Sequence, residues 1–349
     1  MKILLSSPAF APSVGGLETV VALLAEGFAA RGHDVVVVTA TPAGAADPTE
    51  AGEARVVRRP SARERLRWAL WCEVYFQANV SLRELWPLLL VRRPWVVNHH
   101  SWYCRTDGHI ALADRLKRGL LPFAAASIAV SHAMAADLAR TWPRSRARVL
   151  PNPYRAELFH LRPQIPRDQD LLFVGRLVSD KGADLLLAAL ARLAARGIEP
   201  GLTIVGDGPE REPLEDQARK AGLAGRVRFL GRRRGEELAR ELCRHRLLVV
   251  PSRYQEPFGV VALEGIACGA VVVGSAGGGL AEAIGPCGRT FPNGDAGALA
   301  EVLAALLADP AACERLRSGA GEHLARHQPG AVADAYLAVL AEVAGRRAA

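Results

Sequence analysis

The amino-acid sequence predicts an α/β protein with two doubly wound domains, each a parallel sheet covered by helices on both faces. Short runs of branched apolar residues alternate with segments whose apolar residues recur at helical spacing, which is typical of parallel sheets. This alternation begins at residue 3 and begins again at residue 171. A length of 349 residues also favours two domains over one.

The first domain is expected to open with a strand, a glycine loop, a helix and a second strand. Residues 3–5 and 35–39 are the expected strands, and residues 96–98 form a further one. Gly32 follows the expected helix as a stop signal. The helix itself is indicated by apolar residues at helical spacing, namely Leu17, Val20, Val21, Leu24 and Phe28.

The second domain repeats this order of strands and helices. Strands are expected at 171–175, 202–206, 227–231, 247–251 and 271–275, with helices at 183–197, 211–222, 235–245, 260–270 and 296–309.

The domain boundary is expected in residues 150–170, which hold four prolines and have no clear periodicity. The predicted domains are therefore residues 1–155 and 156–330. The last helical stretch, 331–344, fits either domain, and we expect the tail 331–349 to pack back on the first domain.

The formal charge of +8 lies in the first domain. Residues 1–155 hold 20 Lys and Arg against 12 Asp and Glu, whereas residues 156–349 hold 24 of each kind. The densest segment is 54–71, with six arginines, one glutamate, and the tryptophans Trp68 and Trp71. This segment fits an anionic membrane surface or an anionic substrate, and it fits equally well a solvated helix whose tryptophans lie in the core.

Several classes of protein are disfavoured by what the sequence lacks. The six cysteines form no CxxC pair and no cluster with histidine, so we expect neither a structural metal nor a disulfide framework. We therefore expect the protein to work in a reducing compartment. The first apolar run is too short for a signal peptide, and no stretch of 18 uncharged apolar residues could span a membrane. No phosphate-binding P-loop motif occurs. The cysteines are Cys72, Cys104, Cys243, Cys268, Cys287 and Cys313.

Two cations follow the first strand of the second domain. Arg176 and Lys181 lie between this strand and a helix, and such a position favours anions because backbone N–H groups and the helix dipole add to the side-chain charges. Ordinary surface polarity is the alternative. The next loop, with Gly206 and Gly208, has Arg211 at the third position of a dinucleotide fingerprint, so it is interpreted as a turn.

Two carboxylates surround a tight turn at the start of a later helix. Glu256 lies in the loop and Glu264 within the first two turns of the helix, with seven residues between them. The backbone amides of Phe258, Gly259 and Val260 suit oxyanions, and a carboxylate suits a pair of vicinal hydroxyls. Together they suggest a nucleotide diphosphate sugar, against the alternative of a dipole-favoured and a solvent-facing glutamate.

Two glycine loops and a histidine pair complete the candidate residues. Gly277–Gly279 follow a strand and precede Glu282, and residues 12–18 follow the first strand of the chain. Glycine there permits close approach of the backbone or a positive φ. His99 and His100 end a strand and point to opposite faces, so at most one faces a ligand, and packing is the alternative for both.

Taken together, these segments resemble the GT-B glycosyltransferases, specifically the retaining glycosyltransferase family 4. The stretch 256–279 resembles the family's E-x7-E signature and the strand after it, 174–182 its phosphate loop, and 15–18 its N-terminal glycine loop. The stretches 128–138 and 149–153 resemble its interdomain-facing segments. The resemblance implies two Rossmann-like domains facing a central cleft, with the acceptor on the first and the nucleotide sugar on the second.

The resemblance also implies roles for matching residues in the second domain. Arg176 and Lys181 would hold the donor diphosphate and stabilise the leaving group. Glu264 would bind the ribose, and Glu256 would contact hydroxyls of the transferred sugar. No catalytic metal or other cofactor is implied, because the nucleotide sugar is a substrate.

Further implied residues are Gly278 and Gly279, which would line the donor site. In the first domain, Gly15 and Gly16 would let the backbone approach the diphosphate. His100 would face the transferred sugar, with His99 left open. The expected catalytic residues are thus Arg176, Lys181, Glu256 and His100.

Two departures from the family pattern limit what can be transferred. Pro153 stands where relatives commonly have glycine, so a role for Asn152 is doubtful. Residues 76–81 lack a charged group or second histidine that many relatives have, so no acceptor contact is assigned there.

The expected activity is transfer of a hexosyl group, with retention, from a nucleotide diphosphate sugar to a saccharide, lipid-linked or small-molecule hydroxyl. A uridine diphosphate sugar is preferred, and guanosine diphosphate mannose is the main rival. The basic first domain suggests an anionic acceptor and a cytoplasmic enzyme, peripheral to the inner membrane face and active in glycan or polysaccharide biosynthesis. The alternatives are a sugar-nucleotide epimerase or hydrolase, a nucleic-acid-binding protein, and an inactive binding module.

Overall fold

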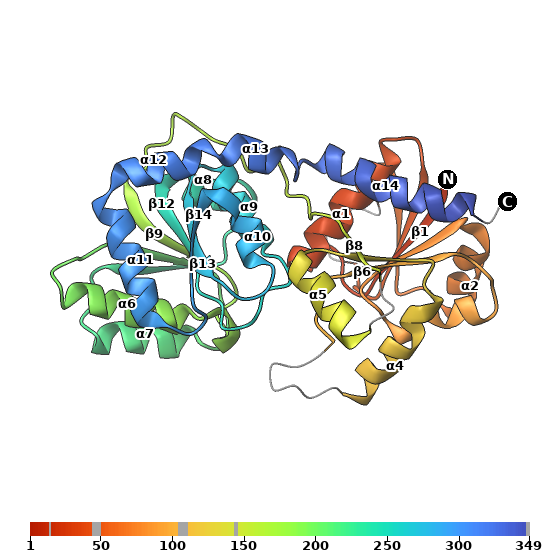
Figure 1. Ribbon diagram of the computed structural model, residues 1–349, viewed down its shortest axis with the longest axis horizontal. Coiled ribbons are helices and arrows are strands. Elements are labelled where there is room, and N and C mark those ends of the chain that lie inside the picture. Colours follow the sequence, from red (N-terminus) through yellow and green to blue (C-terminus); the bar gives the residue numbers. More distant parts are fainter. Residues whose placement is uncertain (14, 44–49, 104–110, 143–145, 347–349) are drawn as a thin grey trace. The chain divides into compact units, whose positions relative to one another are not determined.

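The computed structural model divides the chain into two compact units, residues 1–154 with 327–349, and residues 155–326 (Figure 1). The first division lies one residue from the predicted boundary at 155, and the last 23 residues of the chain return to the first unit. The structure describes residues 1–13, 15–43, 50–103, 111–142 and 146–346.

The first unit is built on one sheet with the strand order β3-β4-β2-β1-β5-β6-β7-β8. All its described strand pairs are parallel except β3 with β4. Its inner strands are buried on both faces, which explains their continuous apolar runs. The strands are β1 (Lys2–Ser7), β2 (Asp34–Thr39), β3 (Glu50–Ala51), β4 (Ala54–Arg58), β5 (Val74–Ala78), β6 (Trp95–His99), β7 (Ala126–Ala129) and β8 (Arg148–Val149).

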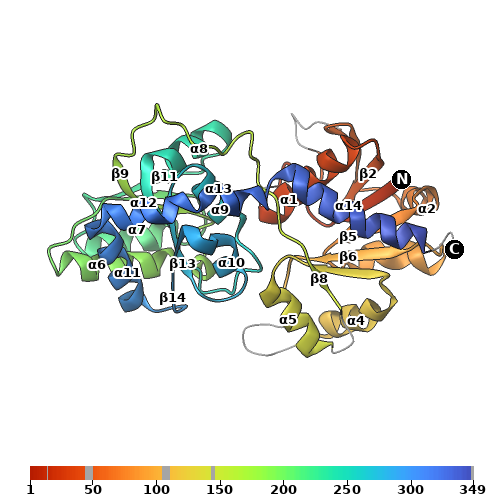
Figure 2. The same ribbon diagram turned by 45° about the horizontal axis from the view of Figure 1, so that its top comes forward.

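One face of this sheet is covered by α1 (Gly16–Ala29) and by the last helix, α14 (Pro329–Gly345), which lie side by side in Figures 1 and 2. The Phe76 ring of β5 meets Phe28 of α1 and Tyr336 of α14 edge-on, with centroids 6.2 and 6.0 Å apart. Arg31 also forms an ion pair with Asp334. The chain's tail therefore forms part of the core of the first unit.

The other face is covered by a second layer of helices. Side chains from α2, α3, η2 and α5 share one apolar cluster with the strands. The helices of this layer, with α4 among them, are α2 (Ala62–Trp71), α3 (Leu82–Leu85), η1 (Trp86–Leu89), α4 (Leu112–Leu120), η2 (Leu121–Phe123) and α5 (His132–Thr141).

The structure shows how the tryptophans of the basic segment 54–71 pack. Trp68 is buried, and Trp71 packs against it edge-on with centroids 5.5 Å apart. The guanidinium groups of Arg55 and Arg67 lie over the Trp68 ring, each 5.1 Å from its centroid. Trp68 is a core residue, and half-buried Trp71 packs against the core cluster, so the packing of the unit accounts for both tryptophans.

The second unit has a parallel sheet with the strand order β11-β10-β9-β12-β13-β14. All five strands predicted in this half are present within a few residues of their predicted bounds. They are β9 (Gln169–Val174), β10 (Leu202–Val205), β11 (Val227–Gly231), β12 (His245–Val250) and β13 (Val271–Ser275), and β14 (Gly288–Phe291) adds an edge strand.

Helices cover both faces of this second sheet, as Figure 2 shows. The core between α6, α11 and the strands is rich in leucine and alanine. The helices are η3 (Ser179–Lys181), α6 (Ala183–Ala194), α7 (Arg211–Lys220), α8 (Gly235–Arg244), α9 (Val260–Ala267), α10 (Leu280–Ile284), η4 (Gly285–Cys287), α11 (Ala296–Ala308), α12 (Pro310–Ser318) and α13 (Ala320–Ala325).

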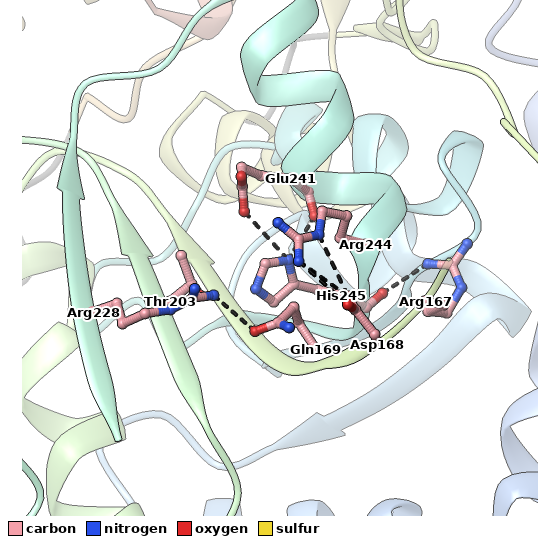
Figure 3. Close-up of polar contacts among 8 residues, drawn as sticks. All are labelled: Arg167, Asp168, Gln169, Thr203, Arg228, Glu241, Arg244 and His245. Carbon is pink, nitrogen blue, oxygen red and sulfur yellow. Dashed lines mark hydrogen bonds and ion pairs between the residues drawn. The ribbon is translucent and has the colours of Figure 1, made fainter. Parts of the chain in front are cut away.

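The amino ends of the strands in this sheet are held by a polar cluster (Figure 3). Arg228 donates to Gln169 Oε1 at 2.7 Å and to Thr203 Oγ1 at 3.0 Å, so it joins three strands. The His245 ring donates from Nδ1 to the Glu241 carbonyl at 2.6 Å, and burial lowers the pKa of His245 to about 4. This cluster is structural, because ligands of open parallel sheets bind at the opposite edge.

The described cysteines are free thiols in buried positions: Cys72, Cys243, Cys268, Cys287 and Cys313. Cys104 lies outside the described residues.

Over the described ranges, no single helix has the length and apolar character to cross a membrane. One strongly bent pair, Ala296–Ala308 with Pro310–Ala325, meets the criterion only when its two halves are joined.

Candidate functional site

The second sheet changes its winding direction between β9 and β12. The chain moves outward from β9 through β10 to β11, then returns to place β12 on the other side of β9. Loops that leave neighbouring strands in opposite directions open a crevice at the carboxyl edge, where parallel sheets bind their ligands. The loop after β9 carries Arg176 and Lys181, the loop after β12 carries Glu256, and α9, which follows that second loop, carries Glu264. The topology thus brings the predicted residues of this unit to the same edge of the sheet.

A direct ion pair joins these two loops. Lys181 Nζ lies 2.5 Å from Glu256 Oε1, with both side chains largely buried. The same oxygen accepts a hydrogen bond from Ser252 Oγ at 2.7 Å. A cation and a carboxylate predicted on separate loops are thus in contact, and the serine fixes the orientation of the carboxylate.

The glycine loop after β13 packs against the backbone of Glu256. Gly279 N donates to the Glu256 carbonyl at 2.7 Å, and Gly278 forms an isolated parallel bridge with Glu256. Gly278 has φ of 75°, and a Cβ added there would lie 2.2 Å from the Glu256 carbonyl oxygen. Only glycine fits this position, which explains part of the glycine run that the sequence analysis singled out.

The loop after β9 is fastened to the loop after β12. Gly182 has φ of 68°, and a Cβ there would lie 2.0 Å from the Pro251 carbonyl oxygen. Arg253 N donates to the Asp180 carbonyl at 2.9 Å. Arg176 begins this loop, and its side chain is exposed to solvent. The two loops form one rigid edge on which Lys181 is fixed and Arg176 remains accessible.

The helix α9 begins directly after this loop. Its N-cap residue is Gly259, with φ of 110°, and no side chain caps the first turn. The backbone N–H groups at this start, those of Phe258, Gly259 and Val260, are the expected oxyanion donors. Glu264 follows on the same helix, partly buried, and burial raises the pKa of its carboxyl to about 7, against an opposing effect of the Arg155 charge.

Two residues of this edge were missed by the sequence analysis. Asn293 accepts a hydrogen bond from Gly277 N at 2.7 Å and donates to the Ser252 carbonyl at 3.2 Å. Ser275, at the end of β13, donates to the same carbonyl at 2.7 Å. These side chains hold the glycine loop and the Glu256 loop together, and no local pattern in the sequence signals contacts between segments so far apart.

The glycine loop of the first unit follows β1, where that sheet also changes its winding direction, between β1 and β5. Gly15 has extended backbone and precedes Gly16, the first residue of α1, while residue 14 lies outside the described residues. At the same edge, Ser6 Oγ donates to buried Glu84 at 2.7 Å, and burial raises the pKa of Glu84.

The two histidines at the end of β6 have different environments. His99 is fully buried and its Nδ1 contacts Tyr103 Oη at 2.6 Å, so it is a packing residue. His100 is less buried, and its backbone N donates to Asn79 Oδ1 at 2.7 Å. Its Nε2 lies 2.7 Å from Asn98 Nδ2, which also contacts Tyr336 Oη at 3.0 Å.

These neighbours fix both the backbone and the ring of His100. Asn79, which holds the backbone, has φ of 64°, a strained conformation of the kind found at functional sites. Burial lowers the pKa of His100 to about 3, so the ring is neutral at physiological pH. The sequence analysis expected a ligand contact at His100 and left His99 open, and the smaller burial of His100 favours the first of these two.

Asn152, where the sequence departs from the family pattern, has a structural role. It is buried, and its carbonyl accepts a hydrogen bond from His327 Nδ1 at 2.9 Å. His327 begins the return of the chain to the first unit. Asn152 therefore anchors this return, and no ligand contact is assigned to it.

Comparisons with known proteins agree with this architecture. Two Rossmann-like domains, each built on a mainly parallel sheet, are the fold of the GT-B glycosyltransferases. Residues 160–323 match the family model described as glycosyl transferases group 1, and residues 14–158 match the model of glycosyltransferase family 4. The chain belongs to glycosyltransferase family 4.

Relatives of known name cover nearly the whole chain. Glycogen synthase of Mycobacterium tuberculosis is 32% identical over 93% of this chain and 90% of its own length. Phosphatidyl-myo-inositol mannosyltransferase of Mycobacterium leprae is 30% identical over 95% and 94%.

Solved structures share the fold at lower identity. Anabaena Alr3699/HepE, crystallised with UDP, is 21% identical with a TM-score of 0.84 and covers 98% of this chain and 100% of its own. Sucrose-phosphate synthase of Thermosynechococcus elongatus is 23% identical with a TM-score of 0.81, over 98% and 99%.

Proposed function

We propose that this protein transfers a hexosyl group, with retention and without a metal ion, from a uridine diphosphate sugar to a hydroxyl acceptor. The observation that carries the proposal is the Lys181–Glu256 pair at the crevice of the second sheet, held by Ser252. This pair supports the proposal because it holds a cation suited to a diphosphate beside a carboxylate suited to sugar hydroxyls.

The donor is proposed to lie along the edge formed by the loops after β9, β12 and β13. Lys181 and Arg176 would hold the diphosphate, and the amides at the start of α9 would add further donors. Glu264 would accept hydrogen bonds from the ribose diol. Gly278 and Gly279 would allow the donor to approach the backbone closely.

The proposed reaction needs no protein carboxylate as acid or base. The acceptor oxygen would form a bond to the anomeric carbon on the face that the diphosphate leaves, as the bond from that carbon to the phosphate oxygen breaks. The acceptor proton would pass to the departing diphosphate. Lys181 and Arg176 would stabilise the negative charge that develops on it, and Glu256 would orient the sugar, unlike the paired carboxylates of glycosidases.

The first unit is proposed to hold the acceptor. Gly15, Gly16 and His100 are proposed to contact the donor from this unit, with neutral His100 as a hydrogen-bonding group. The charge excess within residues 1–155 supports an anionic acceptor, for example a lipid-linked one, and a cytoplasmic enzyme that contacts the inner face of a membrane. The relative named as a phosphatidyl-myo-inositol mannosyltransferase is consistent with such an acceptor.

Donor choice is tested by a thermal-shift screen of nucleoside diphosphates and their sugars. We expect UDP and one UDP-sugar to raise the melting temperature most, with GDP-mannose as the competing result. A preference for GDP would replace the donor but keep the reaction. No shift with any nucleotide at millimolar concentration would overturn the proposal.

The reaction type is tested by incubating the stabilising donor alone and with candidate acceptors. Transfer requires both, whereas an epimerase or a hydrolase of the same fold converts the donor without an acceptor. NMR of the product's anomeric proton then distinguishes retention from inversion. Added chelator should leave the rate unchanged if the reaction is metal-independent.

A further inference from the structure

Exposed large apolar side chains concentrate in the first unit. Leu89 is 82% exposed, Phe123 78% and Leu112 73%, and Leu70, Leu90 and Leu116 are also exposed. Among the described residues of the second unit, Leu161 is the one large apolar side chain with comparable exposure. Single exposed leucines are ordinary, but six in one unit of a chain require a local explanation.

Part of this apolar surface is a stripe along α4 and η2. Leu112, Leu116 and Leu120 are spaced four residues apart, which places them on one face of α4, and Phe123 ends η2, which follows directly. The helix α4 contains no buried residue. Leu120 is half-buried and packs against the apolar cluster of the unit, whereas Leu112 and Leu116 are left exposed.

The remaining exposed residues lie along one edge of the first sheet. Leu70 precedes β5, Leu89 and Leu90 precede β6, and Phe123 precedes β7, and these three strands are neighbours. Arg93 Nη2 donates to the Leu70 carbonyl at 2.5 Å, which ties the first two segments together. The apolar side chains thus gather at the amino edge of the sheet, opposite the edge of Gly15 and His100.

Exposed arginines accompany these apolar side chains. Arg67 lies on the same face of α2 as Leu70, Arg92 follows Leu90, and Arg115 lies beside Leu116. The described acids on or beside these elements have partners: Asp114 is paired with Lys117 at 2.9 Å, Glu64 accepts a hydrogen bond from Ser61 N at 2.9 Å, and Glu73 accepts one from Lys2 N at 2.6 Å. The edge is therefore both apolar and cationic.

We infer that this edge, formed by α2, η1, α4 and η2, docks on the surface of an anionic phospholipid bilayer. Leucine and phenylalanine side chains would enter the boundary between headgroups and acyl chains, while arginines would remain among the phosphates. A lipid surface fits better than a protein partner because the apolar residues are spread along an edge between cations. This surface rests on the membrane contact proposed above and gives it a location. The exposed leucines and Phe123, and not buried Trp68, would form its apolar part.

Vesicle flotation tests this inference without any sugar transfer, so its failure is separable from failure of the proposed reaction. The wild-type chain should bind vesicles of phosphatidylcholine with 30% phosphatidylglycerol, and pure phosphatidylcholine vesicles much less. The variant with Leu112→Ser, Leu116→Ser and Phe123→Ser should partition roughly 30-fold or more weakly, from the loss of three partly inserted side chains. The matched control is Leu161→Ser, which removes an exposed leucine from the second unit and should bind like the wild type.

Two further measurements separate lipid from other occupants. Replacement of Arg92 and Arg115 by glutamate should weaken binding to the anionic vesicles roughly tenfold, and added salt should weaken binding of the wild type. Equal binding of the triple variant and the wild type would overturn the inference. A wild-type dimer in light scattering that the triple variant abolishes would also overturn it, since a second copy of the chain would then cover the edge.

Discussion

The substitution Glu264→Gln gives a prediction whose size follows from the structure. Burial raises the pKa of Glu264 from 4.5 to about 7 in the folded chain. A group with a raised folded pKa contributes stability at low pH that is lost as the pH rises through that value. The ionised carboxylate therefore destabilises the donor-free protein above pH 7, and a neutral glutamine does not.

The expected gain in free energy of unfolding for the glutamine variant, relative to wild type, is below about 1 kcal/mol at pH 5 and about 3 kcal/mol at pH 8. Urea denaturation of both proteins at several pH values measures it, because all other groups titrate alike in the pair. Glu322→Gln, an exposed substitution on α13, is the control and should show no such trend. A difference that does not change between pH 5 and pH 8 would refute the reasoning.

The same carboxylate should control donor affinity in the opposite sense. A ribose diol donates to the ionised form, so binding favours loss of the proton, and affinity for a nucleotide sugar should fall about tenfold from pH 8 to pH 6. In Glu264→Gln the affinity should be weaker and largely independent of pH. Isothermal titration at each pH measures both effects. A wild-type affinity that is equal at both pH values would contradict the proposed ribose contact.

Three further predictions follow from the same edge and from the first unit. Lys181→Ala should lower kcat by about two orders of magnitude or more, because it removes a charge that stabilises the leaving group. The control Lys220→Ala, at an exposed residue of α7, should leave kcat unchanged. Equal rates for the two variants would place the diphosphate elsewhere. Gly278→Ala should lower the free energy of unfolding, measured by urea denaturation, by about 2 kcal/mol or more, because its Cβ would meet the Glu256 carbonyl. The control Gly321→Ala, where a Cβ meets nothing within 4 Å, should not lower it. The pKa of about 3 predicts that His100 stays neutral from pH 5 to pH 9. His100→Gln should therefore lower kcat but leave the shape of its pH profile as in the wild type. A transition near pH 6.5 in the wild type that the variant loses would contradict this, because it would show that the histidine titrates.

The alternation of strands and helices in the second unit could be predicted from sequence because its signals are local. Continuous apolar runs specify the buried strands, and the helical spacing of leucine and alanine specifies α6 and α11. The short strand β4 and the helices that follow it were less visible, since arginine dominates residues 54–67. There the packing of Trp68, and not the polarity of the segment, decides the structure.

The candidate site was predictable in its residues but not in its contacts. Lys181 and Glu256 are 75 positions apart, and their ion pair depends on how the loops after β9 and β12 meet. Asn293 was missed for the same reason, because its partners are backbone groups of distant loops. The raised pKa of Glu264 depends on three-dimensional burial, which no spacing in the sequence expresses.

The measurement that tests the central claim most directly is a crystal structure of the full chain with the nucleotide sugar that stabilises it most. The account predicts density for the diphosphate within hydrogen-bonding distance of Lys181 Nζ and Arg176, with the ribose at Glu264 and the sugar at Glu256. A nucleotide bound at any other edge of the second sheet, with the Lys181–Glu256 pair left undisturbed and far from it, would contradict the account.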